Sequence, residues 1–341
     1  MNKTRVWFFL IFFKFMSLVA SEPLKVAVCI NKLFIGETGF ANKILQAGKN
    51  LGWQVDILEK EDITSNNCEL YDFAIILTPE NYSDLNCKKY LCIFLPMDRY
   101  FNSLGNLVSP YDNYDGYLLS FDPKEHQIHN KTFENKSYLI WYPTSYIPDF
   151  QSKNFDKLFW INCVWGSRTN EKKYIFMLTE LREMDLLHIY GIETKEIKTS
   201  GIIPFEGENL LKIAAQYGIH LVLHSETHIK VGSPTGRIFE ALAVGNIIIC
   251  DEHPFVKKNF KDNVLYIDTS KSDYGMFLQV CNHISWIKNN PIKARDKAKK
   301  AHEIFRKNFS LENQLKELEL FNGLTHVPNI KNNVIIPLFE S

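Results

Sequence analysis

The sequence lacks an excess of charge of either sign. Its 39 Lys and Arg residues balance 39 Asp and Glu residues, so the formal net charge is zero. A chain without a net positive field does not collect nucleic acid or anionic lipid through its overall charge. We therefore expect no nucleic-acid partner, and any anion should bind at a local site.

Cysteine pairs at metal-binding spacing and internal repeats are also missing. None of the seven cysteines forms a C-x-x-C pair, so neither a zinc site nor a disulfide scaffold is indicated. No self-similarity appears at the periods of about 20 to 50 residues that mark repeat proteins. With 341 residues, 45% of them hydrophobic and 23% charged, the chain is long enough for two ordinary globular domains.

A bilayer-spanning apolar run is missing as well. Lys3 and Arg5 precede an apolar segment, residues 6–20, and small residues then lead to Pro23. The segment has about 15 apolar positions, short of the roughly 20 that a membrane span requires. We expect residues 1–22 to be a signal peptide that directs export or entry into a secretory pathway, with membrane association through the same residues as a further expectation. An apolar leader that packs on the surface is the alternative.

What the chain does contain is a rhythm of short apolar runs and amphipathic segments, in two successive blocks. The first block predicts strands at residues 25–30, 55–58, 73–77, 90–95, 116–120 and 138–141. The second predicts strands at 158–165, 186–190, 219–224, 246–250 and 264–267, with helices at 171–184, 208–217 and 234–244. Such alternation predicts an α/β protein of two doubly wound, Rossmann-like domains.

Breaks in this rhythm set the expected domain boundaries. After the leader come an N-terminal domain (23–150), a second domain (151–290), helices packing back across the body (291–325) and a tail (326–341). The helices carry a basic run that suggests nucleic acid or membrane binding. Apolar residues nevertheless recur at helical spacing, which favours a docked face with the lysines in solvent. They are Ala294, Ala298, Ala301 and Phe305, followed by Leu311, Leu315, Leu318 and Phe321.

The segment 232–250 carries the chemistry. Ser233 is suited to cap a helix that starts at Pro234, and Gly245 is suited to end it with a positive φ angle. The backbone N–H groups at the start of such a helix, next to Gly232 and Ser233, favour a phosphate group.

Arg237 and Glu240 share one face of this predicted helix. Arg237, one turn in, is placed to clamp an anion through two hydrogen bonds. Glu240 lies roughly 9 Å along the axis from Pro234, a distance suited to sugar hydroxyls beside a diphosphate. The alternative is that the two residues form only a surface ion pair.

The motif Arg-x-Phe-Glu-Ala-x-Ala-x-Gly, followed by an apolar strand and an Asp-Glu turn, resembles the donor-binding element of nucleotide-sugar glycosyltransferases of the two-domain B fold. The spore-maturation-type branch is the most similar. The resemblance covers about residues 158–270 and implies two Rossmann-like domains facing a cleft. It also implies that Glu240 accepts hydrogen bonds from the nucleotide ribose.

The same resemblance implies a diphosphate-binding turn. Gly166 stands at the expected glycine, and Lys172 follows six residues later, as in the family. In the family, the position just after this glycine usually holds a basic residue. Here that position is Ser167, and Arg168 follows one position later. A solvated helix start is the alternative reading for Arg168 and Lys172.

A further family position departs from the pattern. Many members carry an acidic residue eight positions before the ribose glutamate, and that position is Gly232 here. The spore-maturation-type branch also lacks this acid. The departure weakens the case for the retaining mechanism of members that have both acids.

Candidates for binding the acceptor lie in loops of the first domain, at residues 36–39 and at Asp98 and Arg99. Asp98 is placed to act as a base toward an acceptor hydroxyl, or alternatively to cap a turn. His224 and His228 are interpreted as structural residues with satisfied hydrogen bonds rather than as site residues. No Asp-x-Asp triplet exists to chelate a metal-bound diphosphate, so Arg237 and the helix are expected to neutralise it without a metal or other cofactor.

The sequence therefore predicts an enzyme, a metal-independent glycosyltransferase. It would move a hexose-type sugar from a nucleoside-diphosphate sugar to a hydroxyl of a carbohydrate, lipid or protein acceptor. Two alternatives stay open. One is a sugar-nucleotide epimerase or phosphorylase of the same fold. The other is a non-catalytic, exported two-domain sugar-binding protein.

Overall fold

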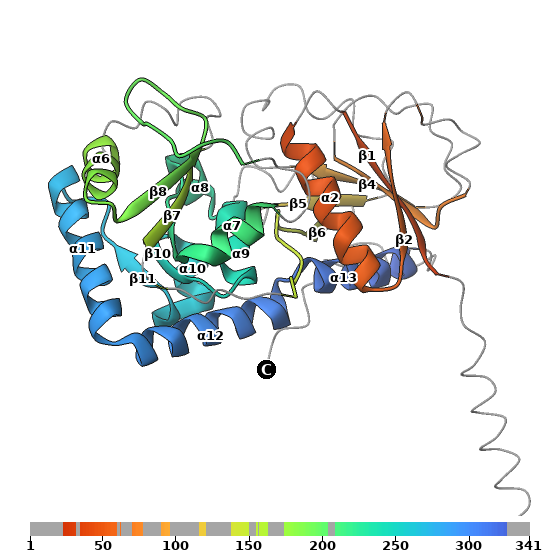
Figure 1. Ribbon diagram of the computed structural model, residues 1–341. Coiled ribbons are helices and arrows are strands. Elements are labelled where there is room, and N and C mark those ends of the chain that lie inside the picture. Colours follow the sequence, from red (N-terminus) through yellow and green to blue (C-terminus); the bar gives the residue numbers. More distant parts are fainter. Residues whose placement is uncertain are drawn as a thin grey trace, which may run out of the picture.

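Two separate parallel sheets form the framework of the molecule (Figure 1). The computed structural model describes residues 23–31, 35–59, 62, 70–77, 90–95, 116–120, 138–149, 155, 157–162, 174–203 and 209–325. The predicted leader and tail lie outside these residues. Within the described helices, none is both long and apolar enough to cross a bilayer.

The first sheet has six strands in the order β2-β1-β3-β4-β5-β6, and every neighbouring pair is parallel. Its strands are β1 (Lys25–Ile30), β2 (Gln54–Glu59), β3 (Phe73–Ile76), β4 (Tyr90–Leu95), β5 (Gly116–Leu119) and β6 (Tyr138–Ile140). The helix α2 (Ile35–Asn50) connects β1 to β2 and packs on both strands. All six strands fall within two residues of the predicted bounds.

The second sheet has five parallel strands in the order β11-β10-β9-β7-β8. They are β7 (Lys157–Asn162), β8 (Leu187–Gly191), β9 (Gly218–Val222), β10 (Ile247–Asp251) and β11 (Leu265–Ile267). Between them lie α6 (Ile175–Glu183), α7 (Asn209–Tyr217), α8 (Glu226–Val231), α9 (Gly236–Ala243), α10 (Pro254–Phe260) and the short 3-10 helix η4 (Lys261–Asn263). The predicted strand at 219–224 is shorter than expected because Ser225 caps α8.

Both faces of the second sheet are covered. Ile247 and Ile249 of β10 pack in one buried cluster, whereas Ile248 and Cys250 pack in another on the opposite face. Successive side chains of a strand point to opposite faces, so a strand covered on both sides reads as a continuous apolar run. This explains why the run at residues 246–250 predicted a strand well.

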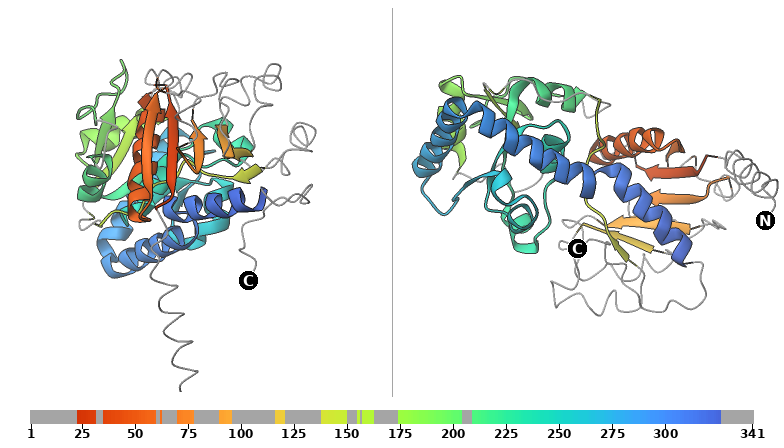
Figure 2. Two further views of the ribbon diagram at one scale, coloured as in Figure 1. Left: turned by 90° about the vertical axis from the view of Figure 1, so that its right-hand side faces the viewer. Right: turned by 90° about the horizontal axis from the view of Figure 1, so that it is seen from below.

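The last described part of the chain, residues 273–325, forms three helices: α11 (Asp273–Asn289), α12 (Pro291–Asn308) and α13 (Leu311–Thr325). The predicted stripe from Ala294 to Phe305 is buried, and α12 packs on α9. The next helix, α13, packs on α2, and Figure 2 shows α12 and α13 running along one side from the second sheet to the first. Helix α11 was not predicted from the sequence.

The start of α13 is tied to the segment that follows β6. The side chain of Gln314 accepts a hydrogen bond from the Tyr142 backbone N–H at 2.7 Å. Glu312 accepts from the Ile147 backbone N–H at 3.1 Å and from Asn50 of α2 at 2.8 Å. These partly buried hydrogen bonds connect α2 beside the first sheet, the segment after β6 and the last described helix.

The strand orders show where ligands are expected. In the first sheet the chain runs from β1 to β2 on one side and to β3 on the other, so the order reverses between β1 and β3. In the second sheet it reverses in the same way between β7 and β9. Ligands of open α/β sheets bind beyond the carboxyl ends of the strands at such points.

Candidate functional site

Glu240 of α9 lies at the centre of a group of three charged side chains. Its Oε2 accepts a hydrogen bond from Arg237 Nη1 at 2.5 Å, and its Oε1 accepts one from Lys43 Nζ, also at 2.5 Å. The Glu240 side chain is only 3% exposed, whereas Lys43 and Arg237 are 18% and 21% exposed. Lys43 comes from α2 of the first sheet, so the group joins the two sheets' helices.

These neighbours set the charge of the carboxyl group. Burial is the largest single influence and would raise the pKa of Glu240, but Arg237 and Lys43 outweigh it and lower the pKa to about 2. Glu240 is therefore ionised at neutral pH and acts only as a hydrogen-bond acceptor. Burial lowers the pKa of His220, on β9, to about 3. The His220 ring also interacts electrostatically with both Glu240 and Arg237.

The helix that presents Glu240 is held from several sides. Every side chain from Ile238 to Ala243 is buried, so α9 is a core helix rather than a surface one. Gly245 follows it with a φ angle of 72°, as predicted. His302 of α12 forms a 2.8 Å hydrogen bond through Nδ1 with the Leu242 carbonyl. Glu240 therefore occupies a fixed position.

The start of α9 differs from the prediction. The helix begins at Gly236 with Thr235 as its N-cap residue, two residues later than the expected start at Pro234. The reason is that Gly232 ends the preceding helix α8 in the left-handed conformation, with φ 66° and ψ 9°. Ser233 is buried and stands in the short link between the two helices. Ser233 is therefore not the helix cap that the sequence predicted.

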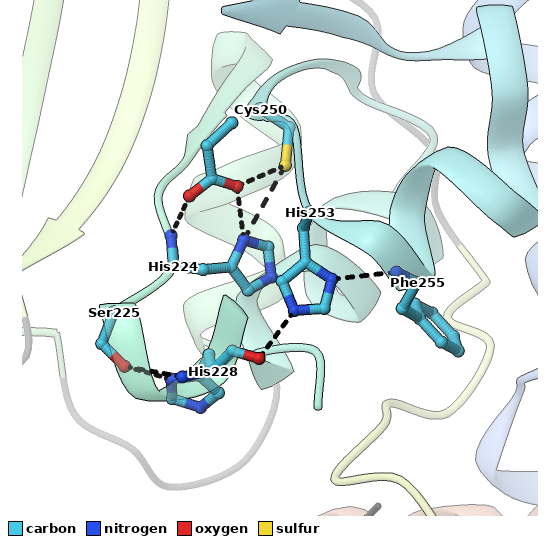
Figure 3. A network of polar contacts seen from close by, with 7 residues as sticks. His224, Ser225, His228, Cys250, His253 and Phe255 are labelled. Carbon is cyan, nitrogen blue, oxygen red and sulfur yellow. Dashed lines mark hydrogen bonds and ion pairs between the residues drawn. The ribbon is translucent and has the colours of Figure 1, made fainter. Parts of the chain in front are cut away.

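A second polar group lies at the carboxyl ends of β9 and β10 (Figure 3). His224 Nδ1 lies 2.7 Å from Asp251 Oδ1, and the His224 backbone N–H donates to Asp251 Oδ2 at 2.6 Å. The His253 ring stacks on His224 with centroids 4.1 Å apart, and its Nε2 donates to the His228 carbonyl at 3.1 Å. His224 Nε2 is buried without a hydrogen-bond partner among the described residues.

Three of these residues could supply metal ligands. Atoms of His224, Cys250 and Asp251 lie within 4.8 Å of one another, and all three residues are buried. Burial raises the pKa of the Cys250 thiol. Hydrogen bonds from His224 outweigh burial and lower the pKa of Asp251. In the structure, His224 and Asp251 are joined by two hydrogen bonds.

The structure brings some predicted site residues together and leaves others undescribed. Arg237 and Glu240 are in contact, and Gly232 and Ser233 stand just before α9. Asp98, Arg99, Gly166, Arg168 and Lys172 lie outside the described residues.

Residues 36–39 were predicted to form an acceptor loop but lie in the first turn of α2. Lys43, Asp251 and His253 were missed as site residues. Nothing in the sequence around Lys43 indicated a role in the site, because its partner Glu240 is 197 positions away. The Asp-Glu turn at Asp251 was noted, and its place directly after a predicted strand was the available signal.

Comparison with protein families gives one match. Residues 168–319 match the model of a family described as glycosyl transferase-like. This range holds α9 with its Arg237-Glu240 pair and covers less than half of the chain. No curated protein matches the chain.

Solved structures resemble nearly the whole fold at low identity. An α-glucosyltransferase in complex with UDP and a 13-mer DNA has a TM-score of 0.60 at 12% identity, over 87% of this chain and 100% of that one. HepE from Anabaena, in complex with UDP and glucose, has a TM-score of 0.53 at 11% identity, over 87% of this chain and 99% of that one.

The pneumococcal O-GlcNAc transferase GtfA, in complex with UDP and GlcNAc, has a TM-score of 0.50 at 12% identity. The alignment covers 75% of this chain but 57% of that one, so this chain spans little more than half of its length. Together with the two parallel sheets, these similarities establish the predicted fold class. The chain has the two-unit α/β architecture of the glycosyltransferase B fold.

Proposed function

We propose that this protein is a glycosyltransferase that moves a hexose-type sugar from a nucleoside-diphosphate sugar to a hydroxyl acceptor, without a metal ion. The observation that carries the proposal is the buried, ionised carboxylate of Glu240, held between two cations on a fixed helix. The family match over residues 168–319 includes this helix and supports the assignment.

In this proposal Glu240 binds the nucleotide ribose. An ionised carboxylate accepts hydrogen bonds and donates none, which suits the two adjacent hydroxyls of a ribose. Its low pKa keeps it in that state across the physiological range. Both Glu240 oxygens already accept a hydrogen bond, so the ribose hydroxyls would either share the carboxylate with Lys43 and Arg237 or displace one of them.

Arg237 supplies positive charge to the diphosphate in this proposal. Negative charge develops on the leaving nucleoside diphosphate as the bond to the sugar breaks, so a guanidinium beside it stabilises the transition state more than the ground state. Gly166, Arg168 and Lys172 would complete the diphosphate site from the turn after β7. The strand order of the second sheet reverses between β7 and β9, and ligands of open sheets bind beyond the carboxyl ends of the strands at such a point.

The acceptor would bind to the first sheet, with Asp98 after β4 as the base for its hydroxyl. We also place the protein with the spore-maturation-type branch, because it lacks the second acid of the common family pattern. Gly232 has a reason to be glycine: it ends α8 with φ 66°, a conformation that an acidic side chain adopts only with strain.

The choice of a first nucleotide follows from the solved relatives. The α-glucosyltransferase and HepE structures both contain UDP. The direct test is to incubate the full chain with UDP-, GDP- and ADP-linked hexoses, with and without simple glycosides as acceptors, and to measure the nucleoside diphosphate released. Release that requires the wild-type protein and is lost in Arg237→Ala supports the proposal. Equal results from wild type and Arg237→Ala would contradict it.

A further inference from the structure

Lys43 reaches from the first sheet's helix into the group around Glu240. Its Nζ lies 2.5 Å from Glu240 Oε1, although 197 positions separate the two residues in the chain. We propose that Lys43 is a donor-binding residue contributed by the first half of the molecule. Its ammonium passes from Glu240 to the diphosphate when the ribose takes over that carboxylate oxygen. This inference rests on the proposed function.

The exchange follows from how the carboxylate is occupied. Arg237 holds Oε2 and Lys43 holds Oε1, and the side chain is only 3% exposed. A ribose hydroxyl that bonds to Glu240 therefore displaces or shares one of these contacts. Arg237 lies three residues before Glu240 on the same helix, so the two side chains stay neighbours, whereas Lys43 belongs to a different helix and has a flexible four-carbon stem. Lys43 is the partner that can move.

The diphosphate is the natural new partner for the displaced ammonium. A lysine ammonium has three N–H donors and is a point charge that binds phosphate without a fixed orientation. In a nucleoside diphosphate the phosphates are attached directly to the ribose. An ammonium that starts beside the ribose site is therefore within a side chain's reach of them.

A purely structural role explains Lys43 less well. Helix α2 is already anchored by Ala41, Ile44 and Ala47, all of which are fully buried in the core. A partly buried ion pair contributes little stability beyond what apolar residues of similar size provide, because desolvation offsets the attraction between the charges. Replacing Lys43 alone by methionine leaves the buried Glu240 carboxylate with one cation fewer, so the variant should lose some stability. Methionine removes the charge, while the fully buried contacts of α2 keep the protein folded.

The test compares a nucleotide with its nucleoside. UDP, GDP and ADP are first titrated into the wild-type protein by calorimetry, and the tightest of them is measured again with its nucleoside on Lys43→Met. Lys49→Met is the matched control, since Lys49 is an exposed lysine in the last turn of the same helix. Circular dichroism and the melting temperature check that both variants fold.

We expect Lys43→Met to weaken binding of the diphosphate at least tenfold. Binding of the nucleoside should stay the same or become tighter, because a competitor for Glu240 is removed. Lys49→Met should bind both like wild type. Unchanged or tighter diphosphate binding in Lys43→Met would show that Lys43 only joins α2 to α9 and does not bind the donor, which would overturn the inference. Equal weakening for diphosphate and nucleoside would also overturn it. If no nucleoside diphosphate binds the wild type, the proposed function itself fails.

Discussion

Glu240 is the residue on which the account depends, and its surroundings give it two roles. Its contacts with Lys43 and Arg237 stabilise the folded chain, and the same ionised carboxylate is the proposed ribose acceptor. A mutation of Glu240 therefore changes both stability and binding. The two effects can be separated, because they respond differently to pH and to ligand.

The low pKa of Glu240 predicts an acid-sensitive contribution to stability. The pKa is about 2 in the folded protein against an ordinary 4.5, so the contribution is complete above pH 4.5 and is lost as the pH falls toward 2. A shift of this size corresponds to roughly 3 kcal/mol. Between pH 5 and 3, urea unfolding of Glu240→Gln should show a clearly weaker pH dependence than wild type.

The prediction concerns the difference in pH dependence of unfolding between wild type and Glu240→Gln. His253 and His220 have pKa values lowered by burial to about 4 and about 3, and they also reduce stability as the pH falls below 6.5. Both histidines are present in wild type and in the variant. Glu319→Gln, at an exposed position, is measured in the same way as a matched control. An identical pH dependence in Glu240→Gln and wild type would show that Glu240 does not carry this charge.

Arg237 gives a second prediction at the scale of the residue. Lysine keeps the positive charge but lacks the planar pair of donors, so Arg237→Lys should lower kcat more than it raises the KM for the donor. Activity should also survive a chelator, since positive side chains replace a metal in this mechanism. The proposed mechanism would be contradicted if a chelator abolished turnover, a divalent metal restored it, and Arg237→Lys had no effect on kcat.

At the scale of the element, the start of α9 is fixed by close backbone contacts. A Cβ atom added to Gly236 would lie 2.9 Å from the Pro143 carbonyl oxygen, in the segment after β6. Real Cβ atoms do not approach a backbone oxygen this closely, so glycine allows α9 to rest directly on that segment. The position of Glu240 relative to the first sheet depends on this contact.

Gly236→Ala should therefore destabilise the protein by about 1 to 3 kcal/mol, the range for overpacking a close contact, even though alanine is the better helix former. Gly52→Ala is the comparison, because its Cβ would meet nothing within 4 Å and only its φ of +78° opposes the change. Urea unfolding of both variants measures the two costs. Wild-type stability in Gly236→Ala would show that the backbone contact is not tight.

The elements also show what could be predicted from the sequence. Buried parallel strands such as β1 and β10 were predicted well, because both faces are covered and the apolar run is continuous. The helix α11 was missed, although Ser272 caps it by accepting a hydrogen bond from the Gly275 N–H. The start of α9 was placed too early because the left-handed conformation of Gly232 cannot be read from a glycine alone.

The site was partly predictable for a similar reason. Arg237 and Glu240 are three residues apart, so their shared face follows from helical spacing. Lys43 comes from the other half of the chain, and nothing local to residue 43 indicates its partner. The pairing of His224 with Asp251 likewise depends on β9 and β10 being neighbours in the sheet. Contacts of this kind appear only once the chain is folded.

At the scale of the whole molecule, the two halves are joined at more than one place. The Lys43-Glu240 pair links α2 to α9, and α13 packs on α2 after α12 has packed on α9. Glu312 and Gln314 fasten α13 to the segment between the sheets. A donor that engages Glu240 therefore acts on the contact between the halves as well as on its own site.

The most direct test of the central claim is a thermal-shift panel on the wild-type protein and on Glu240→Gln. The panel contains UDP, GDP and ADP together with glucose and N-acetylglucosamine. A ligand at 100 times its Kd stabilises a protein by about 2.7 kcal/mol, which is readily detected as a higher Tm. We predict that a nucleoside diphosphate raises the wild-type Tm, and that the shift is much smaller in Glu240→Gln, since a charge-assisted hydrogen bond contributes about 1 to 3 kcal/mol. A free sugar that raises the Tm while no nucleoside diphosphate does would contradict the account and favour a sugar-binding protein.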